Sequence, residues 1–211
     1  MFIDWIRFAA ALVLLLTPIA LFHGKKVHYR PIARDWDTHW WQIVRLGLHT
    51  IDAGRAALGG WLLVDALASN PAAHGLLRYS VLLTEGGVMC TAVLLQTFFC
   101  KEPDSAHAPF AFVGGLLFGI YPPAIAGFPV LIAITVAGGS RTPVAYFPTL
   151  ALALFALGFL FGGKGMIVKL SLGMCAVMLP WLCSLLFSLD LVVSYRAKRS
   201  GDSRGNQPPR Q

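Results

Sequence analysis

The sequence predicts an all-α protein: a polytopic bundle of helices integral to a membrane. Of its 211 residues, 56% are hydrophobic and 13% are charged, whereas ordinary soluble domains carry about 25% charged residues. Six stretches are apolar for nearly their whole length, and an α-helix needs about 20 apolar residues to cross a bilayer. Because lipid offers the backbone no hydrogen-bond partners, such stretches are expected to be helical.

The six hydrophobic segments form one transmembrane domain, residues 1–195, without room for a separate soluble domain. The first is expected to be a retained span, because its apolar run is longer than the core of a typical signal peptide. The second ends at Asn70-Pro71, since a proline disfavours helical geometry in the preceding residue. The predicted segments are 2–22, 43–68, 76–99, 110–138, 144–161 and 168–195.

The fourth segment is interrupted in its middle by Tyr121-Pro122-Pro123. Each proline removes a backbone donor and clashes with the preceding helical turn, so one straight helix is not expected here. Two half-helices, a kinked helix and a re-entrant hairpin all satisfy the pattern. We therefore predict a hinge at Pro122 and Pro123.

Positive charge is concentrated in the loop after the first segment and in the polar tail, 196–211, which is predicted to be disordered and cytoplasmic. Six full spans with a cytoplasmic N-terminus would place that loop outside, against the tendency of Lys and Arg to stay inside. Five full spans put loop and tail on the same side. Five spans plus one unusual segment are favoured, with either the fourth segment re-entrant or the second lying along the surface. The basic residues of the loop are Lys25, Lys26, Arg30 and Arg34.

The second segment carries the best candidate for a polar site. Arg45, His49 and Asp52 are spaced i, i+4 and i+7, so one helix face would hold them, with Arg55 close by. Charged groups within a membrane usually face a bundle interior or an aqueous cavity. These residues are expected to line a cavity that binds an anion or relays protons, with Glu85 of the next segment as a partner. Alternatively, residues 43–55 form an interfacial turn whose charges reach the headgroups.

Enzymatic chemistry has little support in the sequence. His28, Asp37 and His39 in the first loop are weak metal-ligand candidates, but their spacing matches no standard site. The chain contains no HExxH, nucleophile-elbow or phosphate-loop motif. We therefore expect no metal and no cofactor, and an enzyme is not favoured.

Partners are expected to be lipids and possible protein neighbours within the membrane, and no nucleic acid. The basic loop and tail suit anionic headgroups. Two glycine pairs have the four-residue spacing that lets helix backbones approach closely: Gly115 with Gly119, and Gly158 with Gly162. Tight packing within one bundle is the simpler interpretation, and assembly with a second copy or another subunit is the alternative.

These features predict a small transporter or permease-like protein of a bacterial inner membrane. Its polar pathway would run between the second, third and fourth segments, with the proline hinge as the moving part. A structural or accessory subunit of a larger membrane complex is the main alternative. A lipid-modifying enzyme that uses the loop from His23 to His39 is the third.

Overall fold

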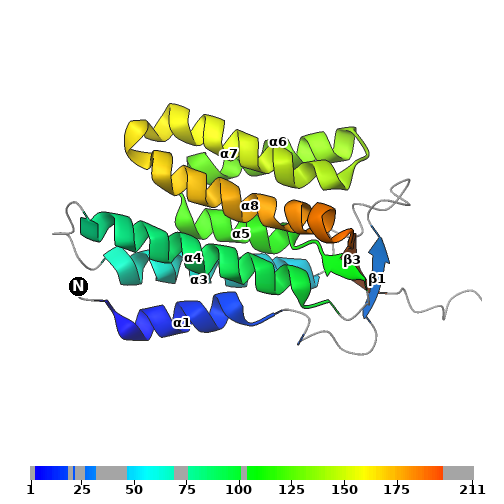
Figure 1. Cartoon of the computed structure of the whole chain (residues 1–211), viewed down its shortest axis with the longest axis horizontal. Helices are drawn as coiled ribbons and strands as arrows, with labels where there is room; N and C mark the ends of the chain where they lie inside the picture. Colours follow the sequence, from blue (N-terminus) through cyan, green and yellow to red (C-terminus); the bar gives the residue numbers. More distant parts are fainter. Residues whose placement is uncertain are drawn as a thin grey trace, which may run out of the picture.

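The computed structural model describes residues 3–18, 21, 27–31, 47–68, 76–100 and 104–196. In these ranges the chain forms a bundle of α-helices with a small three-stranded sheet at one end (Figure 1). The helical bundle is confirmed; the strands were not predicted. The helices are α1 (Trp5–Leu16), α3 (Gly47–Ala68), α4 (Leu76–Phe98), α5 (Phe110–Ile120), α6 (Pro123–Gly139), α7 (Tyr146–Gly162) and α8 (Ile167–Phe187), with 3-10 turns η2 (Pro143–Ala145) and η3 (Lys164–Met166). The strands are β1 (Val27–Pro31), β2 (Ser105–His107) and β3 (Asp190–Arg196).

Three helical stretches in the described ranges are long and apolar enough to cross a membrane: Arg78–Phe98, Pro143–Gly162 and Lys164–Phe187. The outer surface of the bundle is correspondingly apolar, with Leu160 72% exposed and Leu186 76% exposed. Exposed leucines at this density would be costly in water, where apolar area drives burial. Helix length and surface chemistry together indicate a membrane protein.

The first segment forms a shorter helix than predicted. Helix α1 has 12 residues, about 18 Å at 1.5 Å per residue. It ends at Thr17, which is extended (φ −72°, ψ 115°) because the following residue, Pro18, excludes helical geometry there. The apolar run beyond Pro18 does not continue the helix at Leu21, which belongs to a short turn.

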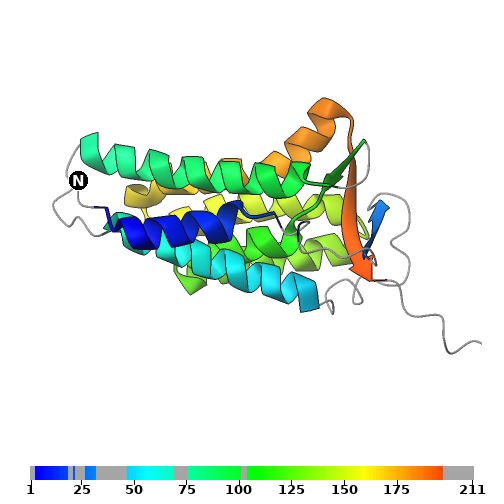
Figure 2. The same cartoon turned by 90° about the horizontal axis from the view of Figure 1, so that it is seen from below.

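The fourth segment is two helices, joined by Tyr121 and Pro122. The start of α5 lies against the start of α7, since the Phe110 and Phe147 rings stack with centroids 5.0 Å apart. The start of α6 lies instead at the end of α7, where Phe128 stacks on Phe161. Helices α5 and α6 are therefore antiparallel and form a hairpin. Its turn stops short of the far end of the bundle, beyond which α4 and the α7–α8 turn extend (Figures 1 and 2).

The sixth segment was predicted as a helix over 168–195, and its last part is wrong. Helix α8 ends at Phe187, where Ser188 adopts a left-handed conformation (φ 52°). The following Leu191, Val192 and Val193 are buried in strand β3. β-branched residues favour such a strand, and partner strands on both sides supply the hydrogen bonds that a helix would otherwise provide.

The sheet joins distant parts of the chain at one end of the bundle. Strand β1, from the first loop, pairs antiparallel with β3, which precedes the tail; β2 pairs parallel with the other edge of β3. The start of α1 lies at the opposite end, as both views show (Figures 1 and 2). The first loop and the C-terminal segment thus leave the bundle at the same end. Residues 32–46 and the predicted disordered tail from 197 onward lie outside the described residues.

The glycines with four-residue spacing pack within the chain. A Cβ on Gly115 would lie 2.1 Å from the carbonyl oxygen of Ala53, and one on Gly119 would lie 2.2 Å from that of Ala57. Helices α3 and α5 therefore touch backbone to backbone and run parallel. Gly158 likewise lies against Leu170, and Gly162 against Met166. Close approach inside one bundle is what these four residues provide.

Candidate functional site

Two clusters of buried charge lie inside the bundle, and the first joins Asp52 to Arg55 on α3. Their side chains are 4% and 12% exposed, and Arg55 Nη2 lies 2.6 Å from Asp52 Oδ1. The i, i+3 spacing puts both on the same helix face. That face is turned into the bundle, because α3 packs against both α1 and α5. The pair therefore faces the interior of the bundle and not its outer surface.

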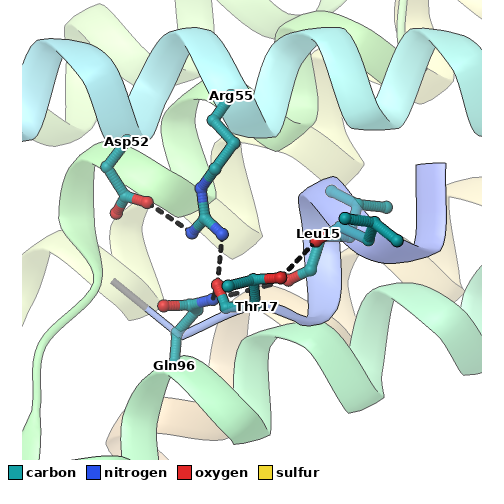
Figure 3. Close-up of polar contacts among 6 residues, drawn as sticks. Leu15, Thr17, Asp52, Arg55 and Gln96 are labelled. Carbon is teal, nitrogen blue, oxygen red and sulfur yellow. Dashed lines mark hydrogen bonds and ion pairs between the residues drawn. The ribbon is translucent and has the colours of Figure 1, made fainter. Parts of the chain in front are cut away.

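The other end of the Arg55 guanidinium serves the end of α1. Arg55 Nη1 donates to the carbonyl oxygen of Thr17, and Gln96 Nε2 of α4 donates to the same oxygen at 3.0 Å (Figure 3). Gln96 also reaches the carbonyl oxygen of Leu15 at 3.4 Å. The last carbonyls of a helix have no partner within it, and Pro18 cannot continue α1 to supply one. Side chains from two other helices satisfy them instead.

Helix α1 is held at both of its ends. At its start, Arg7 forms ion pairs with Asp4 and with Asp65 of α3. At its end, the Arg55 guanidinium also lies over the ring of Phe112, 5.4 Å from the centroid, a favourable cation–π distance. The Asp52–Arg55 cluster therefore fastens α1, α3, α4 and α5 together near the sheet end.

The second cluster joins two of the helices that are long enough to cross a membrane. Lys169 Nζ of α8 lies 2.8 Å from Glu85 Oε1 of α4, and the side chains are 20% and 6% exposed. Gly86 allows this approach, since a Cβ there would lie 2.9 Å from Leu172. A carboxylate inside a membrane needs a partner, and here the partner is a lysine.

Tyr121 completes the second cluster from the turn of the α5–α6 hairpin. Its hydroxyl donates to the carbonyl oxygen of Lys169 at 2.7 Å, and the Lys169 ammonium lies 5.5 Å from its ring centroid. The hydroxyl fits because residue 173 is glycine: a Cβ there would lie 2.2 Å from the oxygen. The turn at the predicted hinge thus contacts the Glu85–Lys169 ion pair through Tyr121, while Pro122 and Pro123 are exposed.

The predicted site residues separate into these two places. Asp52 and Arg55 are together, and His49 lies one turn earlier on α3, partly buried. Glu85 is not beside them: Gln96, which marks the level of Arg55, is eleven residues further along α4, about 16 Å along the axis. Arg45 lies outside the described residues.

Sequence reasoning missed Lys169, Tyr121, Gln96 and Thr17. Lys169 carried a usable signal, because a lysine within an apolar helix should seek a carboxylate. Gln96 and the Thr17 carbonyl carried none, since their role arises only when three helices meet.

The structure describes only one of the three weak metal candidates. His28 lies in β1, while Asp37 and His39 fall outside the described residues. Within the described ranges, no group of three His, Cys, Asp or Glu side chains is placed to hold a metal ion.

No protein-family model matches the chain, and neither a curated protein nor a solved structure is significantly similar to it.

Proposed function

We propose that the chain is a small transporter of a bacterial inner membrane, in which Glu85 takes up and releases a proton. The observation that carries this proposal is the buried Glu85–Lys169 ion pair between two helices of membrane-spanning length. Ionisable residues at such depth are expensive and are characteristic of ion and proton routes. Lys169 supplies the counter-charge that the buried Glu85 carboxylate needs.

Polar side chains at successive depths support a route toward Glu85 from the sheet end. His49 lies in the first turn of α3, Asp52 and Arg55 follow with Gln96 opposite, and Glu85 with Lys169 lies deeper. Histidine changes charge near neutral pH and suits proton transfer. The hairpin turn, whose Tyr121 contacts Lys169, is the moving element of this route.

Proton flux in reconstituted vesicles tests the proposal. The protein is placed in liposomes that contain the pH dye pyranine, and a potassium gradient with valinomycin drives protons inward. We expect faster acidification than in protein-free liposomes, and we expect Glu85→Gln to abolish the difference. Asp190→Asn is the matched control, because that carboxylate is exposed in β3 outside the bundle. Equal acidification with and without protein, or full activity of Glu85→Gln, would contradict the proposal.

The orientation that we propose places the sheet end and the tail in the cytoplasm. In the sequence, five Lys and Arg residues lie between α1 and α3 and five lie from Arg196 onward, whereas the link between α3 and α4 contains none. Positive residues near membrane-spanning helices are retained on the cytoplasmic side, where they also meet anionic lipid. An odd number of crossings, with α5–α6 as a re-entrant hairpin, agrees with this distribution.

An accessory subunit is the second candidate. It is supported by the outer face of α4, where Gly87 is exposed and nothing lies within 4 Å of an added Cβ. A neighbouring helix packs readily on such a surface. Purification in mild detergent should then yield a stoichiometric partner that Gly87→Leu releases. A partner-free protein that still moves protons would exclude this role.

A further inference from the structure

We propose that the Glu85–Lys169 pair is a proton-operated latch for the α5–α6 hairpin. Protonation of Glu85 releases Lys169 from beneath Tyr121, and the hairpin turn then leaves α8. The inference rests on the proposed function in taking Glu85 as the group that exchanges the proton. It adds the regulated element, the hairpin, and the residues that connect it to the proton.

The hairpin turn packs against α8 at Lys169 and Gly173. The Tyr121 hydroxyl bonds to the carbonyl of Lys169, and Gly173, one turn later, leaves the space that the hydroxyl occupies. Tyr121 is 3% exposed, whereas the neighbouring Pro122 and Ala124 are exposed. Tyr121 therefore joins this turn to α8, between the buried side chains of Ile120 and Ile125.

The Glu85–Lys169 ion pair also contacts Tyr121, through the Lys169 ammonium. Lys169 lies between the two groups, 2.8 Å from the Glu85 carboxylate and 5.5 Å from the Tyr121 ring centroid. An ammonium in apolar surroundings is retained only while a counter-charge is present. Lys169 is in the first turn of α8, near the bundle end, so its long side chain can extend to the surface when Glu85 is neutral.

The hairpin itself brings no charged side chain to the contact between Tyr121 and Lys169. Helices α5 and α6 contain no Asp, Glu, His, Lys or Arg. On α8, Lys169 is the charged residue, and α4 presents Glu85 to it. Near this level, Arg78 of α4 donates to the carbonyl oxygen of Gly165, and Lys164 lies in η3 directly before α8. Both are cations, and the thiols of Cys90 and Cys175 lie more than a helical turn further along. One carboxylate therefore determines whether Lys169 stays under Tyr121.

Thiol accessibility in liposomes tests the latch. In a full-length background with the four native cysteines replaced, Ala126→Cys reports a position that is 0% exposed in the first turn of α6. Ala124→Cys, exposed in the same turn, is the reference for reagent reactivity. We expect labelling of position 126 by a small water-soluble thiol reagent, relative to position 124, to rise about tenfold in Glu85→Gln and in Tyr121→Phe.

Matched variants separate a latch from general loosening. Tyr146→Phe removes a hydroxyl that donates to the Phe110 carbonyl at the other end of the hairpin, at 3.4 Å, and it should leave position 126 protected. Lys169→Arg keeps the ion pair and should also protect it. In the otherwise unchanged reporter chain, lowering the pH should raise the 126-to-124 labelling ratio, and Glu85→Gln should remove that pH dependence.

Two results would overturn the latch: a labelling ratio that does not respond to pH in the reporter chain, or an equal rise in Tyr146→Phe. The pH titration needs no destabilising substitution, so a variant that fails to fold does not decide the outcome. Labelling is measured without a gradient and is independent of flux. Proton flux without a change in labelling would leave the transporter and reject the latch, whereas pH-dependent labelling without flux would do the reverse.

Discussion

At the scale of single residues, the buried charges of this protein differ in what they contact. The Arg55 guanidinium pairs with Asp52 of the same helix and donates to the Thr17 carbonyl oxygen at the end of α1. Glu85 meets a lysine on another helix, with a tyrosine from a third element alongside. The first arrangement fastens helices, and the second links α4 and α8 to the turn of the α5–α6 hairpin. We therefore expect the Arg55 cluster to hold together the helices that border the proposed route.

Truncation of Arg55 should be more harmful than truncation of the whole pair. Arg55→Ala leaves the Asp52 carboxylate buried without its partner, which typically costs about 3–5 kcal/mol. Asp52→Ala combined with Arg55→Ala removes the orphan charge and should cost less than the single change. Unfolding titrations in mixed micelles measure the free energy of unfolding of Asp52→Ala, Arg55→Ala and the double variant. If the two single effects simply add, the residues do not act as a pair.

At the scale of elements, close packing of α3 against α5 determines where the hairpin lies. Gly115 and Gly119 bring the backbones together and fix α5 parallel to α3. The hairpin turn is consequently delivered to α8 beside Lys169. The glycine spacing therefore contributes to the candidate site, although its residues have no chemistry of their own.

Alanine at two glycines should have opposite effects. Gly115→Ala places a Cβ 2.1 Å from the Ala53 carbonyl oxygen and must separate α3 from α5, with a loss of about 1–3 kcal/mol. Gly87→Ala meets nothing within 4 Å and should be neutral or stabilising, because alanine favours a helix. Thermal unfolding in detergent compares them. Equal stability of the two variants would mean that α3 and α5 are not in backbone contact.

At the scale of the whole molecule, strand pairing brings two distant parts of the chain to the same end of the bundle. Pairing of β1 with β3 holds the first loop and the C-terminal segment at one end, while α1 begins at the other. Charge follows the same division. This arrangement is the basis of the proposed orientation, which has an odd number of crossings.

Sidedness can be measured with single cysteines in a cysteine-free chain. We expect cysteines in the loop 24–42 and in the tail 200–211 to be labelled from the cytoplasmic side of inverted vesicles. A cysteine between α3 and α4, in residues 69–75, should be labelled from the opposite side. Tail and loop on different sides of the membrane would contradict both the strand pairing and the orientation.

Sequence reasoning determined the class of this protein because the cost of placing a polar backbone in lipid acts on each segment locally. Apolar length and proline positions predicted the span-length helices α4, α7 and α8 and the break at Tyr121-Pro122-Pro123. The spacing of Asp52 and Arg55 likewise predicted that they share a face, since three residues on one helix define their separation.

Only the tertiary structure decided which charges meet. Glu85 and Lys169 are far apart in the chain, and so are Thr17 and Gln96, so their pairing depends on which helices pack together and in what direction. The strands were also beyond local reasoning. In the sequence, Leu191, Val192 and Val193 extend the apolar run of α8, but Ser188 ends the helix and β1 supplies hydrogen bonds to β3. The backbone hydrogen bonds of a helix form within one segment. Which charged side chains pair depends on contacts between segments that are distant in sequence.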